Sequence, residues 1–381
     1  MKSLELLSEY SNYLEEQKLE GKKIIAFMSH DSIPEELIDA AGFIPLRLIF
    51  AGNDDLMNAS HDYLPPSTCS FAQSCIGYFA RKPNLYKFLE LVDYILLSNH
   101  CVSDICVSEI ISDNFNVERL NLYVPYTRNE SAIKYYKIEL ENLRKELENI
   151  IGHEIPDQKI KESIDKYNLF KKKLAEIEKL EISGSQKLEI FQKAILFGPK
   201  ILNEIEKLIQ KNREITSNDS QTESNNKKVI FTGCSIFLGD YLMDLIEESG
   251  GEIVFFNTWI GHNYISQIYS DKILNSTDDP IDLFLYRFKT NIYGDHSVPD
   301  SLDNEISYLE TFINEYQKEN GEKLAVINHV IKFCDHFSLF QSTLKERLQN
   351  KGIQVLNLER DYSRANRGQL STRIEAFMEM I

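Results

Sequence analysis

Short apolar runs that alternate with segments of helical period constrain this chain most. KKIIAFMS (22–29) is followed by a polar loop, a short helical segment and FIPLRLIF (43–50). Pro34 marks the start of the helical segment, with Ser32 as its expected N-cap, and Gly42 marks its end. Buried strand, helix and buried strand in this order form the βαβ unit of a parallel sheet.

The same alternation stops once and then restarts. Residues 130–213 are rich in Lys and Glu, with leucine and isoleucine at helical spacing, which predicts two to four long helices. A polar stretch without aromatic residues follows, and the alternation resumes at KKVIFTGC (227–234). The sequence therefore predicts an α/β protein with two doubly wound parallel-sheet domains joined by a helical section. The expected parts are an N-terminal α/β domain (1–128), a helical section (129–214), a polar linker (215–225) and a C-terminal α/β domain (226–381).

Charge and hydropathy exclude several classes of function. The 381 residues contain 42 Lys and Arg against 59 Asp and Glu, a net charge of −17, so we expect no nucleic-acid partner. No apolar run reaches the length of a membrane span, and the first residues predict an amphipathic helix without the apolar core of a signal peptide. We therefore expect a cytoplasmic protein without a membrane partner. GxxxxGK[ST] and GxGxxG motifs are missing, which excludes an ATPase and a nicotinamide-binding protein.

Three of the six cysteines lie near predicted strand ends or helix starts. Cys69 precedes a helix, Cys101 follows the strand VDYILLS (92–98), and Cys334 follows a strand of the second half. Ligands of open parallel sheets bind outside the carboxyl ends of strands, and thiolates at helix N-termini suit a soft metal or an iron–sulfur cluster. The spacing alone also permits scattered, half-buried thiols.

The other cysteines favour packing roles. Cys75 and Cys106 lie inside predicted helices, where a free cysteine acts as a small hydrophobe. Cys234 ends a strand, a better position for a ligand, but its half already offers Cys334, so packing is the favoured interpretation. A zinc site remains a minor alternative, with one ligand from a histidine. The candidate histidines are His30, His61, His100 and His336.

Several segments, taken in order, resemble one family. They are IPEELIDAAGFIPLRL (33–48), CSFAQSC (69–75), NHCVSDIC (99–106), VIKFCD (330–335) and GQLSTRIEAFMEMI (368–381). These segments are similar to those of the subunits of 2-hydroxyacyl-CoA dehydratases and benzoyl-CoA reductases. The paired cysteines are most similar to the smaller, beta-type subunit.

The resemblance implies a cofactor and partners. It implies one [4Fe–4S] cluster held by Cys69, Cys101 and Cys334, a second related subunit with its own cluster, in a heterodimer or else a homodimer, and an ATP-dependent iron–sulfur activator. In the dehydratases, one electron from the activator reduces the thioester of a 2-hydroxyacyl-CoA to a ketyl radical, which expels the hydroxyl group. The implied function is thus that of an iron–sulfur lyase subunit.

Departures from the family pattern shape the remaining expectations. Asp31 and Leu46 stand where the substrate-binding subunit of the dehydratases has a serine and a glutamate. Asp31 is therefore the candidate catalytic base, and the assignment is weakened because Leu46 stands in place of the glutamate. Asn84 stands where the double-cubane relatives have an additional cysteine, so we expect no double-cubane cluster. Two alternatives stay open: a component of a benzoyl-CoA-reductase-like enzyme, and a stand-alone iron–sulfur electron carrier or assembly protein.

Overall fold

The structure is a computed structural model that describes residues 2–28, 32–216, 226–291 and 299–381. Two four-stranded parallel sheets occupy these residues. The first sheet consists of β1 (Ile24–Met28), β2 (Ile44–Leu48), β3 (Tyr94–Ser98) and β4 (Glu118–Leu122). The second consists of β5 (Lys227–Gly233), β6 (Gly251–Asn257), β7 (Ala325–Ile331) and β8 (Val355–Arg360). The predicted fold class, α/β with two parallel sheets, is confirmed.

Both sheets have the same strand order. The first runs β2-β1-β3-β4 and the second β6-β5-β7-β8, so in each the chain moves from the first strand to one side and then crosses to the other. The change of direction falls between β1 and β3, and between β5 and β7. In doubly wound sheets this switch point is where ligands bind, beyond the carboxyl ends of the two strands.

Helices cover both faces of the first sheet, because its strands bury alternate side chains on opposite sides. Ile25 and Phe27 belong to one apolar core, whereas Ile24, Ala26 and Met28 belong to the other. The first core is covered by α2 (Glu35–Ala40), α6 (Glu130–Ile151), α7 (Asp157–Glu178) and α13 (Pro280–Thr290). The second is covered by α1 (Lys2–Leu19), α3 (Asp54–Ser60), α4 (Ser70–Arg81), η1 (Asn84–Leu91) and α5 (Val102–Phe115).

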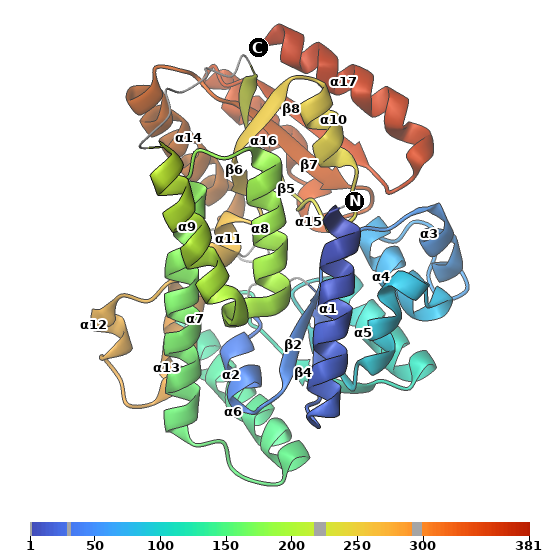
Figure 1. The fold of residues 1–381 in the computed structure, drawn as a ribbon, viewed down its shortest axis with the longest axis vertical. Coiled ribbons are helices and arrows are strands. Elements are labelled where there is room, and N and C mark those ends of the chain that lie inside the picture. Colours follow the sequence, from blue (N-terminus) through green and yellow to red (C-terminus); the bar gives the residue numbers. More distant parts are fainter. Residues whose placement is uncertain (1, 29–31, 217–225, 292–298) are drawn as a thin grey trace.

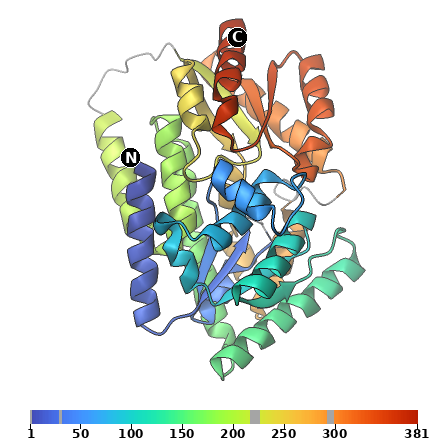
Figure 2. The same cartoon turned by 90° about the vertical axis from the view of Figure 1, so that its right-hand side faces the viewer.

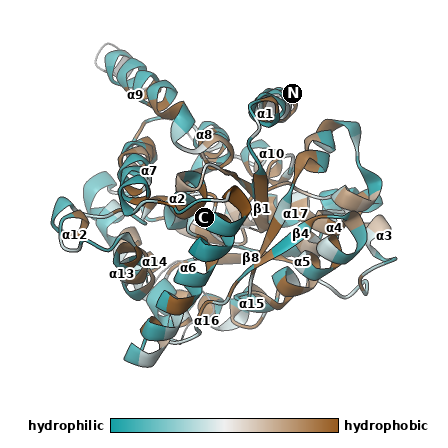
Figure 3. Cartoon of the chain, turned by 90° about the horizontal axis from the view of Figure 1, so that it is seen from below, coloured by the Kyte–Doolittle hydropathy of each residue, from teal (hydrophilic) through white to brown (hydrophobic). Residues whose placement is uncertain are grey.

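The second sheet is covered in the same way. Ile230 and Val326 face α14 (Ser301–Asn320) and α16 (Gln341–Asn350). Phe231 and Ile327 face α8 (Gly184–Phe197), α10 (Leu242–Glu248) and α17 (Arg367–Met380). Figures 1 and 2 show the second sheet, in yellow to red, above the first sheet, in blue to teal. Seen from below, β1 is brown and hydrophobic near the centre of the molecule, whereas the edge strand β4 is largely teal (Figure 3).

The central section is helical, as predicted. It contains α6, α7, α8 and α9 (Leu202–Thr216), with the short η2 (Gly198–Ile201) between the last two. Helix α9 extends two residues into the predicted linker, and residues 217–225 lie outside the described residues. The short elements α11 (His262–Ile265), α12 (Asp271–Leu274), α15 (Asp335–Ser338) and η3 (Arg364–Asn366) complete the set. No helix within the described ranges could cross a membrane.

One expected helix start is wrong. Helix α2 begins at Glu35, and its N-cap position is held by Pro34 without a side-chain hydrogen bond. Ser32 lies before that turn, and its carbonyl oxygen accepts a hydrogen bond from the Tyr136 hydroxyl at 3.0 Å. The proline fixes the local backbone, so the helix starts there without a serine cap.

Main-chain contacts join the two halves beside β2 and β5. The Ala51 N–H donates to the Leu238 carbonyl oxygen at 2.9 Å, and the Leu238 N–H donates to the Ile49 carbonyl oxygen at 2.8 Å. Next to this bridge, the rings of Phe71 and Phe237 stack with their centroids 4.2 Å apart. This junction lies at the ends of two strands that belong to different sheets.

A buried ion pair joins the halves at a second place. Arg287 of α13 donates to both carboxylate oxygens of Glu36 on α2, at 2.5 and 3.1 Å. The Lys171 ammonium lies 4.0 Å from the same carboxylate and 4.6 Å from the centre of the Tyr264 ring. Burial opposes ionisation of Glu36, but the two cations outweigh it and lower its pKa to about 2. Helix α13 thus belongs by sequence to the second half and packs against the first (Figure 1).

This pair predicts a large loss of stability in the Arg287→Met variant. The change leaves the Glu36 carboxylate buried without its main partner, which costs about 3–5 kcal/mol of unfolding free energy. Equilibrium urea unfolding measures the difference. Arg347→Met is the matched control, because Arg347 pairs with Asp303 on the exposed surface, and its loss costs less than about 1 kcal/mol. Equal losses in the two variants would contradict the prediction.

Candidate functional site

The three cysteines predicted as ligands occupy equivalent positions. Cys69, Cys101 and Cys334 are the N-cap residues of α4, α5 and α15. Cys101 follows β3 and Cys334 follows β7, so both lie beyond switch-point strands of their sheets. Cys69 reaches the same region from the segment after β2. The prediction that the two halves each deliver cysteines at strand or helix ends is confirmed.

The thiols of these residues lie close enough to influence one another across the two halves. The thiol of Cys334, together with burial, raises the pKa of the Cys69 thiol. Burial first, and then the neighbouring Cys69 and Asp104, raise the pKa of Cys101 to about 12. Without a bound cation the thiols therefore stay protonated, because each added negative charge would be buried beside another. A soft cation reverses this balance and binds the thiolate forms.

A fourth cysteine joins the group, and sequence reasoning had assigned it to packing. The thiol of Cys234, at the end of β5, is the first cause that raises the pKa of Cys334. Cys234 is buried, and its Sγ accepts a hydrogen bond from the Ile331 N–H at 3.4 Å. The sequence did indicate a possible ligand here, because Cys234 directly follows a predicted strand. Packing was favoured nevertheless, because the same half already provided Cys334 as a ligand.

Backbone N–H groups point at the thiols that were predicted as ligands. Cys69 accepts from Phe71 and Ala72, and Cys334 accepts from Phe337. These hydrogen bonds lower the thiol pKa values and oppose the effects of burial. Hydrogen bonds to sulfur are also a means by which proteins tune iron–sulfur centres.

Among the described residues, the remaining cysteines and histidines form no group that could hold a zinc ion. Both cysteines, Cys75 and Cys106, lie in helices, as expected, and Cys75 is buried in the apolar core, as its predicted packing role requires; Cys106 is exposed, so the packing role predicted for it is wrong. His61 contacts the Gln73 side chain at 3.3 Å, and the His100 ring stacks on Tyr126. His30 lies outside the described residues.

The donor set suits a soft metal centre, although the thiols are turned toward one another. Across the described ranges, no three His, Cys, Asp or Glu side chains form a group that could hold a metal ion as they stand. The thiols instead interact in pairs, Cys69 with Cys334 and Cys334 with Cys234. Four sulfur donors from two sheets, with N–H groups directed at them, are the ligand type that iron–sulfur clusters take. On the chemistry of its donors, the site fits the cluster that the resemblance implies.

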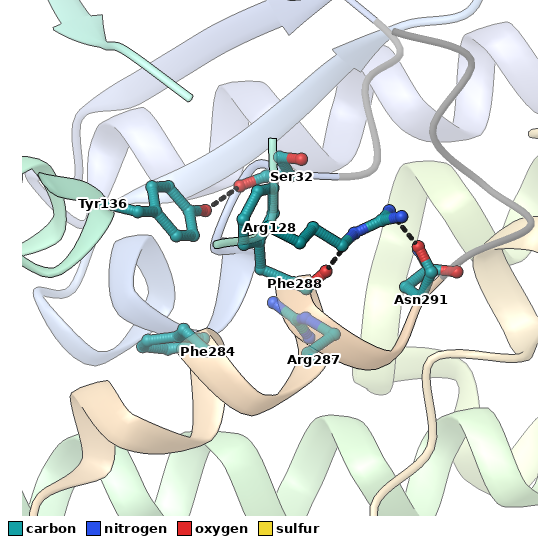
Figure 4. A pocket seen from close by; sticks show the side chains of 7 residues that line it. All are labelled: Ser32, Arg128, Tyr136, Phe284, Arg287, Phe288 and Asn291. Carbon is teal, nitrogen blue, oxygen red and sulfur yellow. Dashed lines mark hydrogen bonds between the residues drawn. The ribbon is translucent and has the colours of Figure 1, made fainter. Parts of the chain in front are cut away.

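The expected catalytic residue Asp31 lies outside the described residues. Ser32, the next residue in the sequence, lines a small pocket. Figure 4 shows the pocket between Ser32, Arg128, Tyr136 and helix α13. Arg128 donates to the carbonyl oxygens of Phe288 at 3.0 Å and Asn291 at 2.6 Å (Figure 4). None of the described residues that line this pocket is acidic.

Leu46 lies in the core. It is fully buried in β2, where it pairs with Ala26 of β1. An apolar side chain in the centre of the sheet cannot act as a proton acceptor, so the position gives no general base.

A buried carboxyl group lies at the ends of β5 and β6. Glu305 of α14 accepts hydrogen bonds from the Thr232 hydroxyl and from the Asn257 amide, both at 2.6 Å. Burial raises its pKa to about 7, and the two hydrogen bonds and His262 act in the opposite direction. Sequence reasoning missed this group, because a glutamate in a polar helix has no local feature that reveals its burial.

Comparison with known proteins gives a consistent family. A family profile described as "2-hydroxyglutaryl-CoA dehydratase, D-component" matches residues 32–381. The chain is 25% identical to the (R)-phenyllactyl-CoA dehydratase beta subunit of Clostridium sporogenes, over 95% of this chain and 92% of that one. It is 23% identical to lactoyl-CoA dehydratase subunit beta of Anaerotignum propionicum, over 95% and 92%. It is 25% identical to a subunit of the benzoyl-CoA reductase of Thauera aromatica, over 89% and 86%.

Glu305 predicts a specific pH dependence of stability. Its pKa is about 7 in the folded chain and 4.5 as a free side chain, so its contribution to stability is present below pH 4.5 and is lost as the pH rises to about 7. We expect Glu305→Gln, which keeps the accepting oxygen, to remove this loss. Urea unfolding between pH 4.5 and 8 measures it, with the exposed Glu315→Gln of the same helix as control. Parallel pH profiles for wild type and Glu305→Gln would contradict the assignment.

Proposed function

We propose, because this chain belongs to the 2-hydroxyglutaryl-CoA dehydratase D-component family, that it is the iron–sulfur subunit of a 2-hydroxyacyl-CoA dehydratase. Cys69, Cys101 and Cys334 would hold one [4Fe–4S] cluster. The observation that carries the proposal is the approach of these thiols to one another from two separate sheets. The dehydratase subunits among its relatives support the same reaction class.

The cluster, when bound, supplies transfer of single electrons at low potential. The residues of this chain hold it and control its surroundings. Cys69 is buried, whereas Cys101 and Cys334 are half-buried. The N–H groups of Phe71, Ala72 and Phe337 stabilise negative charge on sulfur. The electron would come from an ATP-dependent iron–sulfur activator, and the enzyme would work in the cytoplasm.

A division of labour between two subunits is supported by the lack of a base at Leu46 and among the described residues of the pocket. Elimination of water needs a proton acceptor beside the substrate. Leu46 is a core residue, and the pocket beside Ser32 has no acidic side chain among its described residues. We therefore assign the acyl-CoA substrate to the partner subunit, and the relay of electrons to this chain. Asp31 remains the candidate base of this chain.

Apolar side chains beside the thiols support a docking surface for that partner. Val102 follows Cys101, and its side chain is 66% exposed. Phe333 precedes Cys334 and is 39% exposed, and Leu339, directly after α15, is 85% exposed. Exposed apolar side chains gathered near one site are typical of protein interfaces. A partner bound there would bring its own cluster close to this one.

A reductase component is the second candidate function. It is favoured by the likeness to the benzoyl-CoA reductase subunit of Thauera aromatica, which extends over most of both chains. The same thiols and the same docking surface would serve it, so the two functions differ in the substrate of the partner. Activity of the purified complex on a 2-hydroxyacyl-CoA or on benzoyl-CoA separates them.

Iron analysis tests the cluster. We expect anaerobically purified protein to be brown, to bleach in air and to contain about four irons per chain. Ala at Cys69, Cys101 or Cys334 removes most of this iron, because each change takes away a thiolate ligand. Cys75→Ala and Cys106→Ala are the controls and keep it, since one thiol is in the core and the other is exposed. Zinc in place of iron, or iron loss in Cys75→Ala without loss in Cys101→Ala, would contradict the assignment.

Turnover tests the division of labour. We expect the isolated chain, with activator and ATP, to be inactive on a 2-hydroxyacyl-CoA and to become active when its co-purifying subunit is added. Leu339→Glu weakens binding of that subunit at least about tenfold, because it places a charge in the docking surface. Leu19→Glu is the matched control, since Leu19 is 90% exposed at the end of α1. Turnover by the pure chain would refute the relay role and make Asp31 the first residue to mutate.

A further inference from the structure

We infer that Cys234 is the fourth thiolate of this site, so that two cysteines from each half surround the cluster and none of its irons is left open. The inference rests on the proposed function, because it concerns the same cluster. It goes beyond that proposal by assigning a ligand to the iron that three cysteines leave uncoordinated. Contacts around the end of β5 carry the argument.

The backbone conformation of Gly233, directly before Cys234, places the end of β5 against β7. Gly233 ends β5 with φ +89°, a conformation that L side chains rarely adopt. A Cβ atom at this position would lie 2.2 Å from the carbonyl oxygen of His329 on β7. The glycine therefore lets β5 turn sharply in direct contact with β7, and the next residue enters the space beyond the ends of both strands.

His329 then fixes the main chain of Cys234 on both sides. The Cys234 N–H donates to the His329 carbonyl oxygen at 2.8 Å. The Cys234 carbonyl oxygen lies 2.8 Å from Nδ1 of the fully buried imidazole. A carbonyl oxygen only accepts, so Nδ1 carries the proton. Two opposed hydrogen bonds to one residue leave the Cys234 backbone little freedom.

Ile331 ties Cys234 to the predicted ligand Cys334. Its N–H donates to Cys234 Sγ at 3.4 Å, and its carbonyl oxygen accepts from the Cys334 N–H at 2.9 Å. One residue at the end of β7 thus positions both cysteines, and their side chains interact. A cysteine that served only as core packing would not need an N–H group at its sulfur.

The arrangement also matches the topology of the sheets. Cys234 follows β5 and Cys334 follows β7, the two strands on either side of the switch point in the second sheet. Cys69 and Cys101 come from the first half. When every iron is bound by a protein ligand, no coordination position is left for a substrate, as in closed structural metal sites. A cluster with four thiolates therefore suits electron relay and not substrate binding.

Controlled oxidation of the full-length protein tests this inference. A cube with one iron not bound by cysteine loses that iron when one electron is removed: [4Fe–4S]²⁺ gives [4Fe–4S]³⁺, which releases Fe²⁺ and leaves [3Fe–4S]⁺. After anaerobic loading with iron and sulfide, one equivalent of ferricyanide is added. EPR of [3Fe–4S]⁺ and iron analysis after desalting report the outcome. We expect wild type to keep about four irons per chain, and Cys234→Ala to fall to about three with a new [3Fe–4S] signal.

Three further variants separate the possible outcomes. Cys75→Ala is the matched control, a second buried cysteine, and it behaves like wild type. Cys234→Ser keeps the size of the side chain in case Cys234→Ala does not fold, and it also converts to the three-iron form. If four thiolates hold the cube, Cys334→Ala leaves three of them and also converts to the three-iron form, whereas in a three-cysteine site it loses most of its iron. Complete cluster loss in a folded Cys234→Ser, with Cys75→Ala intact, supports the inference as well.

The result that overturns the inference differs from the one that overturns the function. If wild type and Cys234→Ala both convert to [3Fe–4S] to the same extent, Cys234 is not a ligand, and the three-cysteine site stands. If wild type assembles no cube at all, the proposed function fails, and the inference fails with it.

Discussion

Two hydrogen bonds between main-chain groups of the two halves position the two sheets relative to each other. They link Leu238, in the segment after β5, to Ile49 and Ala51, which follow β2 of the other sheet. A third contact lies beside the cysteines, where the Ser70 N–H donates to the Lys332 carbonyl oxygen at 3.1 Å. Because backbone atoms make these contacts, the register between the halves does not depend on flexible side chains. The ends of both sheets consequently face one shared region.

Buried charges stabilise the same arrangement from the other side of the first sheet. The pair of Arg287 with Glu36 couples α13 to α2, and Lys171 adds a second cation from α7. Burial lowers the pKa of Lys171 to about 8, which shows how strongly this region resists a charge without a close partner. Three parts of the chain thus meet in one ionic cluster. The junction near the thiols and this cluster together hold the halves at two separated places.

The sequence was informative where the physical signal is local. Apolar runs and turn residues predicted both parallel sheets and the helical section, and they also predicted the places of Cys69, Cys101 and Cys334 at strand ends or helix starts. The partners of Glu36 and Glu305 could not be predicted, because Arg287 and Asn257 approach them only through tertiary packing. The place of Cys234 after a predicted strand was visible in the sequence. Its closeness to Cys334 depends on the pairing of β5 with β7, which a single sequence does not reveal. Ser32 failed as a cap because Pro34 starts the helix by itself.

The turn at Gly233 has a consequence for how relatives of this protein can be recognised and classified. Since any side chain there would collide with the His329 carbonyl oxygen, a mutation to cysteine at position 234 alone would not recreate the arrangement in a relative with a bulkier residue before it. The glycine is therefore a precondition for a cysteine in this place, whereas the glycine itself does not require a cysteine after it. A cysteine count alone would miss this dependence, because it ignores the residue that lets the chain turn.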